Sequence, residues 1–194
     1  VIGDSIAYGL HLDGLEAKLQ AQLGGPARIS FDGARSITTP GNQIKKSALD
    51  SVNDDRAFIA KASIIIIVLG MSQQEVSFEA SQKQLLQLLK TIAPQAQYYW
   101  VDIGGTIAPQ VPGWIERNKI LYGNASQLGY RVISRFKAIF GANADPMAIK
   151  PGQNFPGWTT EEGYGGAGNI HGFNAELSKV ILDTLAAAKS CRQK

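Results

Sequence analysis

Six consecutive apolar residues, 64–69, constrain the fold of this chain more than any other stretch. Four isoleucines, a valine and a leucine follow one another here, and Gly70 ends the run. A strand with one face in solvent alternates apolar and polar side chains, whereas an uninterrupted β-branched run is typical of a strand buried on both faces of a parallel sheet. The run is far too short to span a bilayer, which takes about 20 apolar residues.

Strand-like and helix-like patterns alternate along the rest of the chain. Besides residues 63–69, strands are predicted at the start of the chain and at residues 27–31, 97–103 and 130–136. Apolar residues at helical spacing predict helices after Ser5, over residues 79–92 and 113–128, and from residue 173 onward. Residues 37–53 are expected to be mostly loop with a short helix, and residues 57–62 a helical turn.

This alternation predicts an α/β fold in three α/β/α layers, built on a flavodoxin-like, five-stranded parallel sheet. At 194 residues the chain is long enough to bury a full core, and we expect residues 1–194 to form a single domain. Right-handed crossovers place the carboxyl ends of all strands at one edge of such a sheet, where ligand sites gather. Residues that follow the strands are therefore the first candidates for a functional site.

The first nine residues, VIGDSIAYG, place a serine at this edge. Val1 and Ile2 are predicted to end a buried strand, Gly3 and Asp4 to form a tight turn, and Ser5 to begin a helix. A helix N-terminus offers free N–H groups and a partial positive charge that favour a developing oxyanion, so Ser5 is a candidate nucleophile. The alternative is that Asp4 or Ser5 only caps the helix.

The sequence Val-Ile-Gly-Asp-Ser-Ile-Ala at a strand end resembles the first motif block of the SGNH (GDSL-type) hydrolases, whose catalytic Ser and His lie at opposite ends of the domain. His171, just before the last predicted helix, matches the place of the family's histidine. The resemblance covers essentially the whole chain. It implies a serine esterase that hydrolyses a carboxylic ester, such as an O-acetyl ester on a small molecule or carbohydrate, through a Ser5 acyl-enzyme with His171 as base. An acetyltransferase of the same fold is a close variant.

The residue that should orient His171 departs from the family pattern. The family's acid lies three positions before the histidine, where this chain has Gly168. A backbone carbonyl or Asn169 could orient the imidazole instead, or Glu161 or Glu162 could reach it from the preceding loop. An orienting carboxylate can be worth about 10⁴ in turnover. The third alternative is an inactive site, which would make the chain a binding or structural protein, for example a glycan-binding one.

The oxyanion donors depart from the pattern as well. The family uses the nucleophile's own N–H, a glycine N–H after the second strand and an asparagine side chain after the third. Losing one such donor typically costs about 3 kcal/mol. By spacing, the candidates in this chain are the backbone N–H of Ser5, that of Ser36 or Gly33, and the side chain of Ser72, Gln73 or Gln74.

Substrate-binding candidates come from two places. Arg35, after the second strand, would bind an anionic group, although a surface arginine is the commoner case. The other place is the long stretch 137–170, which has six glycines between Pro151 and Ile170. A loop this long inside a compact domain is usually functional or disordered. Its interspersed aromatic residues favour an ordered loop that faces a ligand; they are Phe155, Trp158 and Tyr164.

Composition narrows the classes of partner. A net charge of +3, 44% apolar and 18% charged residues are typical of a soluble globular protein, and the scattered basic residues predict no nucleic-acid site. Two histidines argue against a His-rich metal site, and one cysteine excludes an intramolecular disulfide. We expect no metal and no cofactor.

No signal peptide or transmembrane segment is recognised in the sequence. The chain begins inside a predicted strand, so residues upstream of Val1 are expected. The cellular location stays open, an extracytoplasmic one included.

A nucleotide-binding flavodoxin-like domain would use the turn at residues 3–9 as a phosphate cradle, but the usual Gly-rich fingerprints are missing. The resemblance to the SGNH hydrolases implies a small-molecule ester or a glycan as the partner.

Overall fold

The computed structural model describes residues 1–72, 77–104, 110–150 and 174–190. Within them, five parallel strands form one sheet with the order β2-β1-β3-β4-β5. This order is the flavodoxin-like one, so the predicted five-stranded parallel sheet is confirmed. The strands are β1 Ile2–Gly3, β2 Ser30–Phe31, β3 Ile64–Val68, β4 Gln97–Val101 and β5 Arg131–Ile133.

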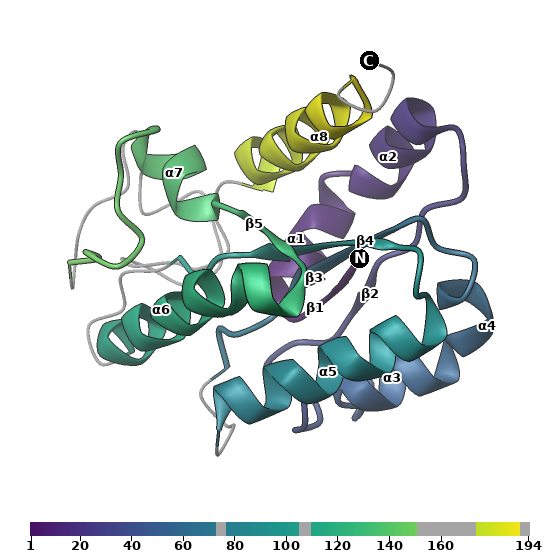
Figure 1. Ribbon diagram of the computed structural model, residues 1–194, viewed down its shortest axis with the longest axis horizontal. Helices are drawn as coiled ribbons and strands as arrows, with labels where there is room; N and C mark the ends of the chain where they lie inside the picture. The colour runs from purple at the N-terminus through teal and green to yellow at the C-terminus, as the bar shows by residue number, and fades with distance from the viewer. Residues whose placement is uncertain (73–76, 105–109, 151–173, 191–194) are drawn as a thin grey trace.

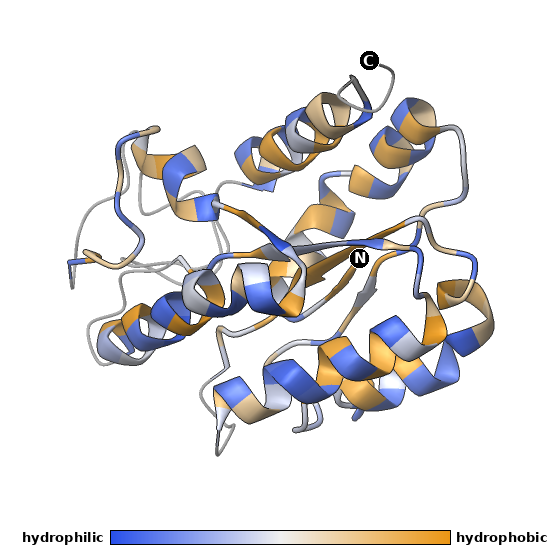
Figure 2. Cartoon of the chain, viewed as in Figure 1, coloured by the Kyte–Doolittle hydropathy of each residue, from blue (hydrophilic) through white to orange (hydrophobic). Residues whose placement is uncertain are grey.

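Helices cover both faces of the sheet and complete the three predicted layers (Figure 1). Figure 2 shows that the helices carry both hydrophobic and hydrophilic residues, in alternating patches along each ribbon. One layer contains α1 Ser5–Leu12, α2 Leu15–Leu23 and α8 Asn174–Ser190, with α7 Arg135–Phe140 beside α8. The other contains α3 Ala48–Asp54, α4 Arg56–Ile59, α5 Phe78–Ile92 and α6 Val111–Leu128.

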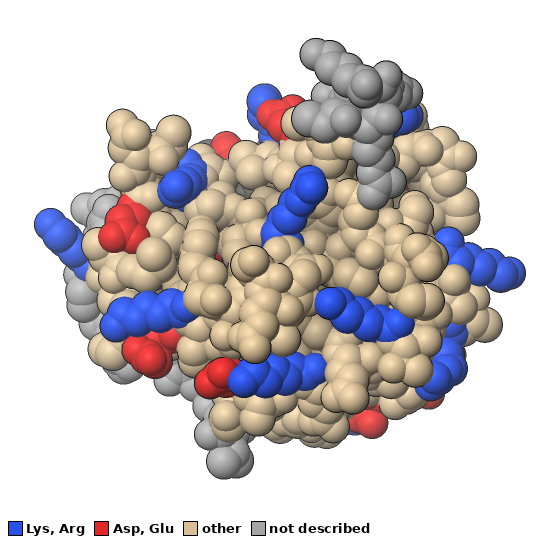
Figure 3. Space-filling view, in the orientation of Figure 1, with Lys and Arg blue, Asp and Glu red and all other residues tan. Residues whose placement is uncertain are grey.

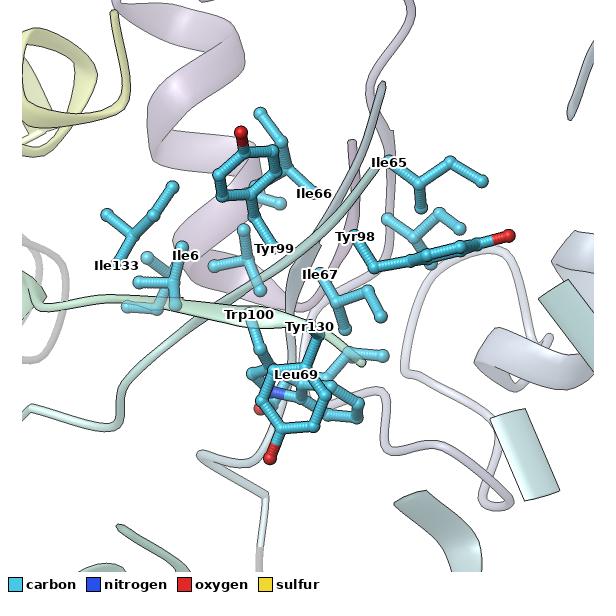
Figure 4. Close-up of a cluster of buried hydrophobic side chains, with 14 of the residues drawn as sticks. Ile6, Ile65, Ile66, Ile67, Leu69, Tyr98, Tyr99, Trp100, Tyr130 and Ile133 are labelled. Atoms are coloured by element: carbon cyan, nitrogen blue, oxygen red, sulfur yellow. The ribbon is translucent and has the colours of Figure 1, made fainter. Parts of the chain in front are cut away.

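The core is centred on β3 and β4, whose side chains alternate between the two layers (Figure 4). Ile66 and Tyr99 lie on the α1 side, whereas Ile67 and Trp100 lie on the α5 side. Trp100 is fully buried and packs edge-on against Phe78 of α5, with ring centroids 6.0 Å apart. The apolar run of the sequence is thus buried on both faces, as predicted.

Two of the differences from the predicted elements have a clear local cause. The first helix divides at Gly14, whose φ of 73° is left-handed and separates α1 from α2. The strand expected over residues 130–136 stops at Ile133, because the Ser134 hydroxyl accepts a hydrogen bond from Lys137 N (3.1 Å) and begins α7. The apolar pattern predicts a longer strand there, but the capping serine begins a helix instead.

The start of α8 packs directly on α1 at Gly9. A Cβ on Gly9 would lie 2.4 Å from Asn174 Oδ1. We therefore expect Gly9→Ala to lower the free energy of unfolding by about 1 to 3 kcal/mol through overpacking, as measured by urea denaturation.

Gly123→Ala is the matched control, because Gly123 lies on the exposed face of α6 with nothing within 4 Å of an added Cβ. It should raise the free energy of unfolding by roughly 0.5 to 1 kcal/mol. Adding Asn174→Ala to the Gly9→Ala chain should recover most of the loss. Equal effects of the two glycine substitutions would contradict the contact.

Candidate functional site

Ser5 lies at the carboxyl edge of the sheet, where a central strand meets a helix. β1 ends at Gly3, and Asp4 N–H extends its pairing by donating to Val68 O (3.1 Å). Ser5 then begins α1 and is partly exposed. A Cβ on Gly3 would lie 2.4 Å from Ala7 Cβ and 2.8 Å from Val68 O, so only glycine fits this turn. This is the placement of the serine that the sequence predicts.

The N-cap of α1 is Asp4, which has only 1% of its surface exposed. Its Oδ1 accepts a hydrogen bond from Ile6 N (2.9 Å), so Asp4 holds the turn. Burial raises the pKa of the Asp4 carboxyl from 3.8 to about 6, although the Ile6 hydrogen bond and the charges of Arg135 and Arg35 oppose the rise. The remaining N–H groups of the helix end, with their partial positive charge, lie beside Ser5.

The buried Asp4 carboxyl predicts a pH dependence of stability. Because its pKa is higher in the folded than in the unfolded chain, its contribution to the free energy of unfolding is full below about pH 4. The contribution is lost as the pH rises through about 6. Asp4→Asn keeps the cap without the charge, and should be more stable than wild type at pH 7 by up to about 3 kcal/mol.

Urea denaturation between pH 3.5 and 8 checks this prediction, and the advantage of Asp4→Asn should vanish below pH 4. Asp50→Asn is the control of opposite sign, because hydrogen bonds from Ser47 lower the pKa of the Asp50 carboxyl. That variant should lose stability above pH 4. A pH-independent difference between wild type and Asp4→Asn would contradict the raised pKa.

Arg35 joins three elements from inside the fold. It is fully buried, and its Nε donates to Gly3 O (3.0 Å), its Nη2 to Ser30 O (2.6 Å) and its Nη1 to Ser51 Oγ (2.8 Å). The sequence predicts a substrate contact or a surface position for Arg35. Its guanidinium instead faces the interior, so the structure gives it a structural role next to Ser5.

The loop after β2 is held by Asp32, which is also fully buried and accepts the backbone N–H groups of residues 43–45 at 2.8–3.0 Å. Ser36 N–H donates to Thr39 O (3.1 Å), and its Oγ accepts from Thr39 N (2.9 Å). The Ser36 amide is therefore engaged in its own turn. Gly33 is partly exposed, and within the described residues its N–H has no partner, while its carbonyl accepts from Asn42 N (2.8 Å).

Residues 70–72, after β3, are held by α6. Arg117 Nη1 donates to Gly70 O (2.5 Å) and to Ser72 O, and Trp114 Nε1 donates to Met71 O (3.1 Å). Both α6 side chains are buried. The spacing in the sequence predicts an inward Trp114, but gives no signal for Arg117, because a helix arginine is usually exposed. Ser72 itself is partly exposed.

A second buried polar cluster lies where β4 and β5 end. Burial raises the pKa of the Asp102 carboxyl, in spite of three hydrogen bonds that it accepts. Arg135 is buried beside it, and burial lowers the pKa of its guanidinium to about 10 against the opposing charges of Asp102 and Asp4. The cluster therefore stabilises the ends of β4 and β5. The three donors to Asp102 are Ser134 Oγ (2.6 Å), Tyr122 OH (2.9 Å) and Phe136 N (3.1 Å).

Tyr8 and Phe31 form an aromatic pair that was not predicted from the sequence. Tyr8, three residues after Ser5 on α1, packs against Phe31 at the end of β2 with ring centroids 5.0 Å apart. His11 lies 5.2 Å from the same ring, and its Nδ1 hydrogen-bonds to Glu16 (2.7 Å). Tyr8 and Phe31 are both partly exposed. Ser5 and Tyr8 are three residues apart, so a helix places them on the same side. This spacing is the sequence feature from which a position of Tyr8 beside Ser5 could have been predicted.

The remaining predicted site residues lie outside the described part of the chain, and their roles stay predictions. The described residue nearest to His171 in the sequence is Asn174, whose side chain contacts Gly9, one helical turn along α1 from Ser5. The residues outside are His171, Asn169, Gly168, Glu161, Glu162, Phe155, Trp158, Tyr164, Gln73 and Gln74.

Basic side chains are dispersed over the face seen in Figure 3 and form no continuous stripe there. In the described ranges, no three His, Cys, Asp or Glu side chains come together as a group that could hold a metal ion. None of the helices in those ranges is long and apolar enough to cross a membrane.

The fold is a three-layer α/β/α architecture with a flavodoxin-like strand order and a serine after the first strand. No protein-family model and no curated protein matches the sequence. Among solved structures, the chain is similar to a carbohydrate esterase family 2 enzyme with a carbohydrate-binding domain from Corynascus thermopiles (Myceliophthora fergusii). The TM-score is 0.59 and the identity 14%, over 97% of this chain and 65% of that one, which is less than two thirds of its length.

The chain is also similar to the periplasmic domain of a lipopolysaccharide acetyltransferase from Salmonella ser. Paratyphi A. Here the TM-score is 0.55 and the identity 14%, over 97% of this chain and 81% of that domain. At this identity the two likenesses establish the fold alone.

Proposed function

We propose that this chain is a serine ester hydrolase of the SGNH type that acts on an O-acyl, most simply O-acetyl, ester of a carbohydrate or small molecule. The observation that carries the proposal is the position of Ser5, in the first turn of a helix that follows a central parallel strand. A nucleophile there has helix N-terminal N–H groups beside the place where an oxyanion develops. The two similar structures support the proposal, because by name one is an esterase and the other belongs to an acetyltransferase.

In the proposed reaction, Ser5 Oγ attacks the ester carbonyl carbon while His171 accepts the hydroxyl proton. The N–H groups of Ser5 and Gly33 stabilise the tetrahedral oxyanion. Gly33 is preferred to Ser36 because the Ser36 N–H is already bonded to Thr39 O. Collapse expels the alcohol, which takes the proton from His171, and leaves an acyl group on Ser5. A water molecule, deprotonated by His171, then attacks the acyl carbon, and Ser5 Oγ takes the proton back from His171 as the acid leaves.

The proposal requires His171 to reach Ser5. Three residues of extended chain span about 10 Å, which bounds the distance between His171 and Asn174. Asn174 contacts α1 one turn from Ser5, so chain connectivity permits the pair. We further propose that a neutral acceptor, Asn169 or a backbone carbonyl, orients the imidazole in place of the acid that Gly168 lacks.

This dyad predicts a gain of function for Gly168→Asp. A carboxylate stabilises the imidazolium better than a neutral acceptor, so kcat/KM for p-nitrophenyl acetate should rise about 10- to 100-fold. Gly166→Asp is the matched control, because it adds the same charge two positions earlier and should leave kcat/KM nearly unchanged. If Gly168→Asp has no effect while Glu161→Gln or Glu162→Gln is severe, a loop glutamate orients His171 and the neutral-acceptor dyad is wrong.

Sugar substrates fit the aromatic side chains of this region. Tyr8 and Phe31 present two partly exposed rings, one of them three residues from Ser5 on α1. Phe155, Trp158 and Tyr164 remain predicted to face the substrate beside Ser5. Flat aromatic faces provide apolar contact area for the C–H faces of a sugar ring. The carbohydrate esterase among the similar structures is consistent with such a substrate.

The second candidate is a glycan-binding protein that keeps the fold without the chemistry. Gly168 and Ser72, which replace the family's acid and asparagine, favour it. Acetate release from acetylated xylan oligosaccharides, measured beside calorimetric binding, separates the two. Release above the level of Ser5→Ala supports the hydrolase, whereas binding without release supports the glycan-binding protein. We do not propose a nucleotide site, because the Asp4 carboxylate already caps the helix end where a phosphate would bind.

A further inference from the structure

Two side chains of α6 bind the backbone that follows β3, and they bind three consecutive carbonyls. Arg117 donates to Gly70 O (2.5 Å) and to Ser72 O. Between these two, Trp114 Nε1 donates to Met71 O (3.1 Å). Because Trp114 and Arg117 are three residues apart in one helix, they lie on the same side of it. The carbonyls of residues 70–72 therefore all face α6.

Buried contacts fix this arrangement. Trp114 is fully buried and Arg117 is only 8% exposed, and the Arg117 guanidinium lies 5.3 Å from the centre of the Phe78 ring. A buried guanidinium needs acceptors for its N–H groups, which the two carbonyls supply. Gly70 makes the turn with a φ of 128°, and a Cβ there would lie 2.6 Å from Ile103 Cδ1. The peptide planes after β3 thus have one defined orientation.

This orientation also sets the direction of the N–H groups. In a trans peptide the N–H points opposite to the carbonyl, so the N–H of Ser72 points away from α6, toward the layer that contains α1. Met71 N–H has the same direction. Burial raises the pKa of the Asp4 carboxyl, and Met71 N–H is among the groups that oppose the rise, so it faces Asp4. In the part of the chain that the structure describes, Ser72 N–H donates to no acceptor.

Ser72 and Ser5 occupy equivalent places on two adjoining strands. Asp4 N–H donates to Val68 O (3.1 Å), so the turn after β1 lies beside the end of β3. Ser5 follows Asp4 as Ser72 follows Met71. Each serine is the first partly exposed residue after a buried stretch, which ends at Asp4 in one strand connection and at Met71 in the other. Both N–H groups therefore reach the surface at the same edge of the sheet.

We propose that the backbone N–H of Ser72 is an oxyanion donor, with Trp114 and Arg117 as its positioning residues. This role rests on the proposed ester hydrolysis by Ser5. As Ser5 Oγ bonds to the carbonyl carbon and its proton passes to the base, the π electron pair of the ester carbonyl moves to the oxygen. Ser72 N–H donates to this oxygen together with Ser5 N–H, and the pair returns when the alcohol leaves. The Ser72 hydroxyl is then not needed in place of the family's asparagine.

Two replacements at position 72 separate the N–H from the hydroxyl. The α-hydroxy acid analogue of serine, introduced by stop-codon suppression, turns the Met71–Ser72 amide into an ester and removes only the N–H. This chain should lose about 100-fold in kcat for p-nitrophenyl acetate, with KM changed less than about 3-fold. Ser72→Ala keeps the N–H and should lower kcat by no more than about 3-fold. The same amide-to-ester replacement at Gly25, which is exposed before β2, is the control for the ester bond itself.

Arg117 variants test the positioning role. Arg117→Met removes the donors to both carbonyls and keeps an unbranched side chain, so kcat should fall at least about 10-fold at constant KM. Arg117→Lys should recover part of this loss, because an ammonium can still donate to a carbonyl. Tyr130→Phe is the control for stability, since it removes a buried hydroxyl that donates to Leu121 O of the same helix. It should lower the urea midpoint and leave kcat at 25 °C unchanged.

The outcomes separate this role from the proposed function. Full kcat in the chain with the ester at position 72, a 100-fold loss in Ser72→Ala, or unchanged kcat in Arg117→Met would each overturn the role of the Ser72 N–H. Ester hydrolysis by Ser5 would stand in all three cases. A wild-type chain that hydrolyses the ester no faster than Ser5→Ala would overturn the proposed function and the role of Ser72 with it.

Discussion

Ser5→Ala is expected to lower kcat for p-nitrophenyl acetate by at least about 10³-fold, because the acyl-enzyme cannot form without the Ser5 hydroxyl. The fold should survive this change. Ser5 is partly exposed at the first position of α1, and the cap is supplied by the Asp4 side chain. Far-ultraviolet circular dichroism and the urea midpoint should match wild type within the error of the measurement.

The matched control is Ser47→Ala, which makes the same chemical change at another helix N-terminus. Ser47 caps α3 by accepting Asp50 N–H (3.1 Å), so this variant should lose about 1 kcal/mol of stability and keep full turnover at 25 °C. A Ser5→Ala chain that hydrolyses the ester as fast as wild type would remove Ser5 from the mechanism and leave the glycan-binding alternative.

Arg35→Ala is expected to lower the free energy of unfolding by about 3 to 5 kcal/mol. The substitution leaves the buried carbonyl of Gly3 and the partly buried carbonyl of Ser30 without the donors they have in the native chain, and it opens a cavity beneath β1. Tryptophan fluorescence during urea denaturation measures the loss, because Trp100 and Trp114 are fully buried reporters.

Arg28→Ala is the control for the loss of an arginine as such. Arg28 pairs with Asp55 at 3.0 Å, but 53% of its side chain is exposed, so this substitution should cost no more than about 1 kcal/mol. Similar losses for Arg35→Ala and Arg28→Ala would contradict the structural role of Arg35 and return it to the candidates for substrate binding.

The layers of the fold were predictable because they depend on local patterns. The uninterrupted run at residues 64–69 places β3 at the centre, and the apolar spacing within residues 79–92 predicts α5 nearly to its ends. The break at Gly14 and the short helix α7 were not anticipated. A left-handed glycine and the cap of Ser134 each act on a single residue, and the apolar pattern around them continues unchanged.

The candidate site was predictable only in part. Gly-Asp-Ser at the meeting point of a strand and a helix places Ser5 at the sheet edge, and this depends on adjacent residues alone. The buried anchors Arg35 and Arg117 bind backbone carbonyls that are 32 and 47 residues away in the chain. No local pattern identifies such partners, so a buried arginine resembles an exposed one in sequence. The pairing of Ser5 with His171 has the same long-range character and remains a prediction.

Labelling with a fluorophosphonate tests the central claim most directly, because the reagent reacts with a serine only when a base activates it. The protein is incubated with the reagent, digested and analysed by mass spectrometry, beside Ser5→Ala and His171→Ala. The proposed mechanism predicts one adduct per chain, located on Ser5, absent in Ser5→Ala and formed at least about 100-fold more slowly in His171→Ala. An adduct on another residue, no adduct at all, or labelling of Ser5 that does not depend on His171 would contradict it.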